Sequence, residues 1–524
     1  MKKKRRKPKK SKPKVVEINV QEIEDIIDAT ATGPLSEEKR EKLRSTLRLL
    51  IEQLGPESRN SEKLKELIDE VLDEEAPKSD EPQKPKKRKP GNGRNGAVKF
   101  KGAKKVPVPY EGLKPGDNCP LCPTGKVYPM NKPRVIIRLT GMAPVQATVY
   151  ELERLRCNLC GEVFTAEAPE GVGSKKYDET VPSILAVLTY GSGFPRNRLA
   201  GLQGKLGIPL PPTTQWDLVK EAAEKVEPVF EELIRQAAQG DVLYSDDTSR
   251  KILKLERPPD DTRTGIFTSG IVSTSARGRD GPQIALFFTG RQHAGENLRD
   301  VLQHRAEELA QPITMNDALS RNTPKQDGVP MDVEAANCLA HGRRYFVDRF
   351  ENFPEECGYV LEALGTVFYY DRQAEQQGLD PEERLKFHQV HSGPVMGDLH
   401  DWLCKQIDEK LVEPNSGLGK AINYLRNHWN RLTLFLRKAG APLDNNTAER
   451  GLKKAVLHRK NALFYKTKRG AEVGDLFTSL IYTCELNGIN PFEYLTLLQR
   501  QSDEVRKNPA DWLPWNCPGL PAGE

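Results

Sequence analysis

The sequence has few aromatic residues, no long apolar run and no apolar segment behind its basic start. Of its 524 residues, 37% are hydrophobic and 7% are aromatic, a polar composition that predicts linkers or tails beside the folded parts. No run approaches the ~20 apolar residues that cross a bilayer, so we expect no membrane partner. The start, MKKKRRKPKKSKPK, is followed by an acidic, mixed stretch, which excludes a secretory signal.

The sequence contains few cysteines, and their number is odd. The nine cysteines argue against a pure disulfide framework, and they favour a reducing, cytoplasmic location. The length of 524 residues exceeds one ordinary domain and predicts roughly three or four folding units.

Charge of one sign is concentrated in blocks, although the net charge is small. Lys and Arg number 80 against 74 Asp and Glu, which leaves +6. Residues 1–14 and 82–105 are strongly basic, and the acidic stretch IDEVLDEEAP lies between them. Such blocks are usually solvated, but basic ones also bind polyanions through counterion release. Each basic block is therefore either a solubilising segment or a nucleic-acid contact.

Residues 15–76 carry two apolar stripes at helical spacing, Leu43–Leu54 and Leu64–Leu72. They predict a helical hairpin, with a short coiled coil as the alternative. The Pro, Gly and Lys content of residues 77–106 predicts a basic flexible linker.

Two matched C-x2-C pairs follow the linker. Cys119 and Cys122 are separated by 34 residues from Cys157 and Cys160. Each pair can place two thiolates on one ion, and four thiolates complete a tetrahedral zinc shell. A redox dithiol or unrelated core cysteines are the alternatives. We expect one structural Zn²⁺ in a module whose intervening segments alternate like hairpin strands.

Residues 176–239 are predicted to be helical. Apolar runs end before Gly207, and a long amphipathic helix begins near Thr213. A helix, a glycine-containing turn and a second helix fit a helix-turn-helix DNA-binding segment. An ordinary helical hairpin is the alternative.

The pattern then changes to strands. The runs DVLYSDD, GIFTSGIVSTSA and QIALFFTG predict an antiparallel meander. A helix over about 296–310 and a fourth strand over 312–317 follow, and this β-β-β-α-β order is that of a ribonuclease-H-like core. Residues 334–438 are predicted to be helical throughout, and a later helix is predicted to begin with Asp444 as its N-cap.

Three acids fall where such a core would bring them together. Asp246 ends the first predicted strand, Asp317 ends the fourth, and Glu449 lies on the later helix. Three carboxylates suit Mg²⁺ or Mn²⁺, and two such ions can clamp an in-line phosphoryl displacement. The alternatives are ordinary turn carboxylates, or Asp247 as the inward-pointing acid.

Polar and basic residues accompany these acids. The polar ones are Ser245, Thr248, Asn316, Asn445 and Asn446. Positive charge on or after the Glu449 helix suits phosphate binding, with a solvated basic face as the alternative. The predicted DNA-binding residues here are Arg450, Lys453, Lys454, Arg459 and Lys460.

The motifs YSDDTSRKIL, PITMNDALSRN, NCLAHGRRYF and DNNTAERGLKKAVLHRKNALFYKTKRGAEVGDLFTSLIYTCELNGINPFEYL resemble those of insertion sequence 66 family transposases over roughly residues 110–500. The resemblance implies Asp246, Asp317 and Glu449 as the catalytic acids of a DDE enzyme. The family usually has Asp-Glu-Thr where this chain has Asp-Asp-Thr at residues 246–248.

Cys338 and His341 form a C-x2-H pair at the start of the predicted insertion. DDE enzymes with helical insertions often carry such a pair near DNA. His341, with Arg343 and Arg344 beside it, is therefore expected to contact DNA, and a buried structural pair is the alternative.

The resemblance implies a transposase that cuts the ends of its element and joins the 3′ ends to target DNA, using two Mg²⁺ or Mn²⁺ ions. Expected partners are terminal inverted repeats, target DNA, further copies of the chain and small accessory proteins from the same element, in a bacterial cytoplasm at the nucleoid. Alternatives are a nuclease that cuts without joining, a catalytically inactive zinc-containing DNA-binding regulator, and a structural interaction protein.

The predicted fold class is multidomain α+β: a ribonuclease-H-like α/β core with an all-α insertion, preceded by a four-cysteine zinc-binding module and a helical DNA-binding segment. The predicted divisions are a basic tail (1–14), a helical hairpin (15–76), a linker (77–106), the zinc module (107–175), the helical segment (176–239), the first part of the core (240–332), the insertion (333–440), the second part of the core (441–500) and a C-terminal tail (501–524).

Overall fold

A computed structural model describes residues 114–118, 126–128, 143–156, 163–170, 175–257, 263–275, 281–326 and 328–518. The chain divides after Arg138, and the elements below belong to the unit that begins at Leu139. The two basic blocks, the helices predicted within 15–76 and the four cysteines predicted to bind zinc lie outside the described residues. No described helix is both long and apolar enough to span a membrane.

The region before residue 175 contributes one short hairpin. Strands β1 (Arg154–Arg156) and β2 (Val163–Thr165) pair antiparallel.

The helical segment is present as predicted. It comprises α4 (Thr180–Ala186), a π-helical turn η2 (Val187–Gly191), α5 (Arg196–Lys205) and α6 (Pro212–Ala238). Gly207 has a φ of +76°, which suits the turn between α5 and α6. The apolar face of α6 is buried in the same core as the sheet and the C-terminal helices, so this segment is packed into the main body of the unit.

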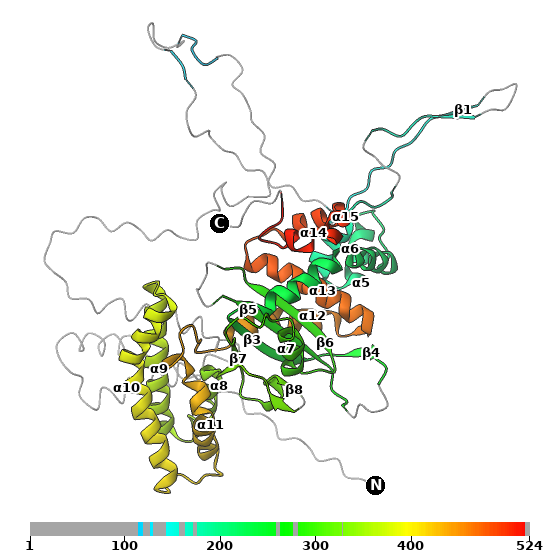
Figure 1. Cartoon of the computed structure of the whole chain (residues 1–524). Helices are drawn as coiled ribbons and strands as arrows, with labels where there is room; N and C mark the ends of the chain where they lie inside the picture. The colour runs from blue at the N-terminus through cyan, green and yellow to red at the C-terminus, as the bar shows by residue number, and fades with distance from the viewer. Residues whose placement is uncertain are drawn as a thin grey trace, which may run out of the picture. The chain divides into compact units, whose positions relative to one another are not determined.

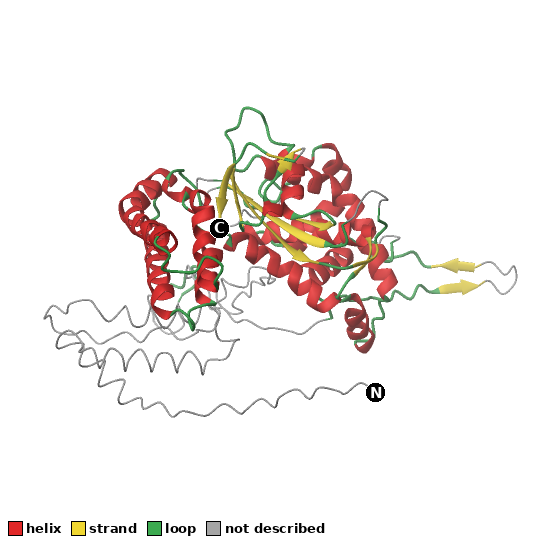
Figure 2. Cartoon of the chain, turned by 90° about the horizontal axis from the view of Figure 1, so that it is seen from below, coloured by secondary structure: helices red, strands yellow, loops and turns green. Residues whose placement is uncertain are grey.

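A five-stranded mixed sheet forms the centre. Strands β3, β5 and β6 are antiparallel neighbours, whereas β7 and β10 run parallel to β3 on its other side. The predicted meander and the fourth strand beside the first are therefore both present (Figures 1 and 2). In spatial order the strands are β10 (Glu334–Asn337), β7 (Ile313–Asn316), β3 (Val242–Ser249), β5 (Phe267–Thr274) and β6 (Ile284–Gly290).

Three predicted boundaries were wrong. Strand β3 continues past Asp246 to Ser249, and helix α7 (Ala294–Leu302) is shorter than predicted. Residues Glu334–Asn337 form β10 instead of a helix. Their sequence, EAAN, has little strand propensity, so pairing with β7 overrides the local preference.

Helix α13 (Lys468–Leu486) covers the edge strand β6 and satisfies its outward N–H groups. Four residues of a helix advance about 6 Å along its axis, and two residues of a strand advance about 6.6 Å. Polar side chains at every fourth helix position can therefore meet the N–H groups of every second strand residue. This edge ladder closes an edge that would otherwise invite pairing with another chain. Its rungs are Gln283 N to Asn487 Oδ1 (3.1 Å), Ala285 N to Thr483 Oγ1 (3.0 Å), Phe287 N to Ser479 Oγ (2.9 Å) and Thr289 N to Asp475 Oδ2 (2.6 Å).

The insertion is an all-α body, as predicted beyond β10. Helices α9, α10 and α11 lie side by side on one flank of the sheet (Figures 1 and 2). Their apolar residues share one core with Ile313, Met315 and Ala336 of the sheet. The bounds are α8 (Leu339–Val347), α9 (Pro354–Gln376), α10 (Pro381–Asp408), α11 (Gly417–Leu432) and the 3-10 turn η5 (Leu434–Leu436).

The chain returns to the sheet in α12 (Asn446–Ala462), whose N-cap is Asn445 rather than the predicted Asp444. Strand β11 (Tyr465–Thr467) pairs with β4 (Ile252–Lys254). Part of the region predicted as a C-terminal tail is folded. After α14 (Pro491–Arg500) come α15 (Ser502–Lys507) and the 3-10 turn η6 (Pro509–Trp512), and Leu513 is buried in the main core.

Candidate active site

Asp246 and Asp247 point to opposite faces of the sheet. Asp246 pairs with Gly270, and a Cβ on Gly270 would lie 3.1 Å from Cδ2 of Leu452 on α12. Side chains of directly paired residues share a face, so Asp246 points to the face that α12 covers. Asp247 pairs with Ser269, whose hydroxyl accepts from Asn297 of α7. The structure thus separates the two adjacent acids, and Asp246 is the one on the side of Glu449.

Asp247 is enclosed on its own face. Its carboxylate lies 2.8 Å from Nδ1 of His293 and 3.7 Å from Nη2 of Arg321, and its side chain is only 4% exposed. These contacts connect β3 to the start of α7 and to the loop after β7.

Asp317 lies immediately after β7, beside Asp246. Tyr244 pairs with Met315 in the parallel register, so two residues further along the chain Asp246 and Asp317 are at equivalent positions. The carboxylate of Asp317 accepts a hydrogen bond from the side-chain amide of the buried Asn322. Asn322 is itself held because its carbonyl accepts from the side chain of Asn316 at 3.2 Å. The loop after β7 therefore fixes the Asp317 carboxylate.

Glu449 lies in the first turn of α12. Its Oε1 is 3.6 Å from Nε2 of His341 on α8, and the Nδ1 of His341 is buried with no hydrogen-bond partner among the described residues. The structure thus places His341, predicted to contact DNA, against the third acid of the candidate site.

The three acids interact electrostatically. Burial is the main cause that raises the pKa of Asp246 to about 7 from 3.8, and the backbone N–H of Asp247 opposes this by hydrogen bonding. The negative charges of Asp317, Asp247 and Glu449 raise the pKa further. Burial and the neighbouring acids therefore both disfavour ionisation of the Asp246 carboxyl group.

This donor set fits a hard divalent cation. All three groups offer carboxylate oxygen, and a cation would relieve the repulsion that raises the Asp246 pKa. In the described part of the chain, no three His, Cys, Asp or Glu side chains are yet close enough together to hold a metal ion. The acids are gathered in one region without forming a closed coordination shell.

Comparison with known proteins identifies the family. The family model described as "Transposase IS66 family" matches residues 176–473, more than half of the chain. The chain belongs to the IS66 family of transposases. The matched range includes all three acids and the complete five-stranded sheet.

Two relatives of this IS66 family member are uncharacterized proteins of Sinorhizobium fredii. The protein y4hP is 27% identical over 387 residues, which cover 69% of this chain and 66% of y4hP. The protein y4jD is 27% identical over 373 residues, covering 69% of this chain and 71% of y4jD. The chain thus spans about two thirds of the length of these relatives.

The basic residues predicted to bind DNA divide into two groups in this family member. Lys454 forms an ion pair with Glu485 at 2.6 Å, and Arg459 donates to Thr248 at 2.9 Å, so both also support the fold. The others are exposed on α8 and α12 and are available to a polyanion: Arg343, Arg344, Arg450, Lys453 and Lys460.

No role was predicted from the sequence for Asn322, His293 or Arg321. Asn322 follows Asp317 by five residues, and the run DALSRN contained the only available signal, a polar amide shortly after a strand-end acid. His293 and Arg321 contact Asp247 from distant positions, which no local spacing indicates.

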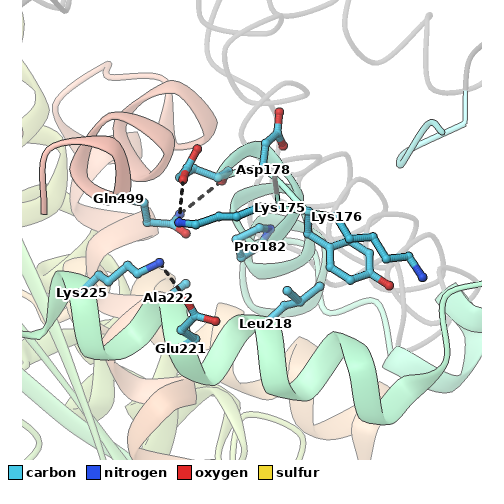
Figure 3. A pocket seen from close by; sticks show the side chains of 11 residues that line it. Lys175, Lys176, Asp178, Pro182, Leu218, Glu221, Ala222, Lys225 and Gln499 are labelled. Carbon is cyan, nitrogen blue, oxygen red and sulfur yellow. Dashed lines mark hydrogen bonds and ion pairs between the residues drawn. The ribbon is translucent and has the colours of Figure 1, made fainter. Parts of the chain in front are cut away.

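A cavity of ≈310 Å³ lies elsewhere, between α4, α6 and α14 (Figure 3). Two of its three lysines are paired with acids: Lys225 lies 2.8 Å from Glu221 and Lys175 lies 3.9 Å from Glu179. None of the three candidate catalytic acids lines it. The cavity is therefore separate from the candidate active site.

Proposed function

We propose that this chain is a DNA transposase that cleaves DNA at the ends of an insertion element and joins the 3′ ends to target DNA. One observation carries the proposal: Asp246 on β3 and Asp317 just after the neighbouring parallel strand β7 lie side by side, and Glu449 approaches from the helix over the same face. These three acids lie within the region that matches the IS66 family.

The topology supports a ribonuclease-H-like core. Three antiparallel strands, a helix and two parallel strands build the order β10-β7-β3-β5-β6. The first acid is on the central strand, the second follows its parallel neighbour, and the all-α insertion separates both from Glu449. This is the arrangement expected of a DDE transposase with a helical insertion.

Asp246, Asp317 and Glu449 would hold two Mg²⁺ or Mn²⁺ ions. When bound, such ions activate the attacking oxygen and stabilise the leaving 3′ oxygen of an in-line phosphoryl displacement. The chain's own part is to hold the three carboxylates in place. Asn322 orients Asp317, and His341 lies 3.6 Å from Glu449, where it can orient that carboxylate.

Binding of DNA is assigned to the exposed cations of α8 and α12, together with the helical segment and the predicted zinc module. The Cys119, Cys122, Cys157 and Cys160 set would hold one structural Zn²⁺. Two element ends must be held together, so we also propose assembly of several copies of the chain, with accessory proteins of the same element as further partners. A bacterial cytoplasmic, nucleoid-associated location follows from these partners.

Replacing both Lys453 and Lys460 by Gln is expected to weaken DNA binding about equally for all sequences. Both side chains are exposed on α12. The slope of log K against log salt is negative, and each lost phosphate contact reduces its magnitude by about 0.9. Titrations at several salt concentrations measure this slope. Lys386→Gln, on the exposed face of α10, is the matched control. An unchanged slope in the double variant would exclude these lysines from the DNA contact.

The proposed activity is tested with the wild-type chain and labelled DNA that carries an end of its element. With Mg²⁺ we expect nicked ends and joined products, and with a chelator we expect neither. Cleavage without joined products would favour a nuclease. Binding without any nicking would favour an inactive DNA-binding regulator, and the absence of both binding and cleavage would leave only a structural interaction protein.

A further inference from the structure

Asn445, directly before α12, connects the segments that carry the three acids. Its side-chain amide donates to the carbonyl of Ser245 at 3.0 Å, and its backbone N–H donates to Sγ of Cys338 at 3.2 Å. Cys338 in turn donates its backbone N–H to the carbonyl of Asn316 at 2.9 Å. We call these three hydrogen bonds the Asn445 clasp.

Two of the residues that the clasp reaches directly precede a candidate catalytic acid. Ser245 precedes Asp246, and Asn316 precedes Asp317. The carbonyl of Asn445 accepts the backbone N–H of Glu449, so Asn445 also begins the helical turn that presents the third acid.

The clasp also closes the base of the insertion. The chain leaves the sheet after Cys338 and returns at Leu443, whose carbonyl accepts the backbone N–H of Leu339 at 2.9 Å. Asn445, Cys338 and Ser245 are all fully buried. Burial excludes water that could replace these bonds, so each bond restricts the position of α12 relative to β3 and β7.

Burial raises the pKa of the Cys338 thiol to about 11. The thiol therefore remains uncharged at neutral pH and serves as a weak neutral acceptor. An oxygen in its place could accept the same N–H, whereas a methyl group could not.

We propose that Asn445 is a positioning residue: through the Asn445 clasp it fixes the first turn of α12, which carries Glu449, relative to the segments that carry Asp246 and Asp317. The inference rests on the proposed function, and it concerns residues that contact neither substrate nor metal. Misplacing a catalytic group by about 1 Å can cost about 10²-fold in rate.

The test compares Asn445→Asp, Asn445→Ala and Asn446→Ala in the full-length chain. Asn445→Asp keeps the size but replaces the donor amide by a carboxylate that faces the Ser245 carbonyl. We expect both Asn445 variants to cleave element-end DNA about 10²-fold more slowly while still binding it. Asn446, which is exposed and bonds only to Asp444 through its side chain, is the matched control and is expected to cleave at the wild-type rate.

Two further measurements separate positioning from general destabilisation. Hydrogen exchange of the metal-free protein should accelerate in the first turn of α12 of the Asn445 variants and stay unchanged in α13. Cys338→Ser retains an acceptor and should cleave at close to the wild-type rate, whereas Cys338→Ala should resemble Asn445→Ala. Uniformly faster exchange over the whole unit would overturn the positioning role in favour of a purely structural one.

The outcomes also distinguish the two proposals. A wild-type chain with no metal-dependent cleavage would contradict the proposed function. A wild-type chain that cleaves, together with Asn445→Asp and Asn445→Ala variants that cleave equally fast, would overturn the clasp alone.

Discussion

Asp246→Asn, Asp317→Asn and Glu449→Gln are each expected to reduce Mg²⁺-dependent cleavage and joining by about 10³-fold or more. Each substitution removes one carboxylate from a site whose cations would contribute several kcal/mol to the transition state, and about 4 kcal/mol corresponds to about 10³-fold. Each replacement is nearly isosteric, so the fold should persist. The measurement is the rate of product formation on element-end DNA at saturating protein.

End binding should survive in all three variants, because the exposed cations of α8 and α12 are untouched. Asp401→Asn is the control, since the Asp401 side chain is 91% exposed on α10. Wild-type joining by any one of the three variants would remove that residue from the catalytic set. The same result for all three would refute a carboxylate mechanism at this sheet.

The candidate acids could be predicted because their positions follow from local patterns. A strand motif ends near Asp246, another ends at Asp317, and the order of strands along the chain brings parallel β3 and β7 together. The choice between Asp246 and Asp247 rested on the family resemblance and could not be made from strand spacing. It depends on which residues of β3 point to the sheet face that α12 covers. Gly270 and Leu452 identify that face, and both lie far from Asp246 and Asp247 in the chain.

Contacts between segments far apart in the sequence could not be predicted either, because no local pattern indicates them. Strand β10 exists because β7 offers a parallel partner, not because EAAN favours a strand. The C-terminal residues expected as a tail are ordered because Leu513 and Cys517 enter the main core. Asn445 was recognised as a polar neighbour of the acids, but its link to Ser245 spans 200 residues.

The edge ladder does carry a sequence signal. Polar residues recur at every fourth position along α13 and its C-cap, between apolar neighbours, at Asp475, Ser479, Thr483 and Asn487. A solvated stripe would show the same spacing, so only the neighbouring apolar residues indicate that this stripe is buried. The ladder shows that a polar face on a helix can be the face that packs.

Asp475, the last rung of the ladder, makes the stability of the fold depend on pH. Burial is the main cause that raises the pKa of this carboxyl to about 8, although the side-chain and backbone hydrogen bonds from Thr289 and the charge of Arg250 lower it. Glu472 raises it further. The folded protein therefore keeps the Asp475 proton at pH 7, whereas the unfolded chain, with a pKa near 3.8, has lost it.

The sign of the effect follows from this difference. Between about pH 4 and pH 8 the folded state binds more protons than the unfolded state, so stability falls as pH rises and levels off above pH 8. In the Asp475→Asn variant the side chain is neutral in both states, and its amide can donate to Thr289 Oγ1 while its oxygen accepts from Thr289 N. This variant should therefore lose the Asp475 contribution to the fall, leaving that of Asp246, and exceed the wild type at pH 8 by on the order of a few kcal/mol.

Thermal unfolding of the wild type and of Asp475→Asn at pH 5, 6, 7 and 8 measures the difference, which should grow with each step. Asp475→Ala is the matched comparison. It leaves the buried N–H of Thr289, which now donates to Asp475 Oδ2 at 2.6 Å, without an acceptor, whereas the Thr289 hydroxyl keeps Thr268 Oγ1 at 2.8 Å as a partner. This variant should therefore be less stable than Asp475→Asn by about 1–3 kcal/mol at every pH. Parallel pH profiles for the wild type and Asp475→Asn would mean that this carboxyl is already ionised inside the fold, with Arg250 as its counter-ion.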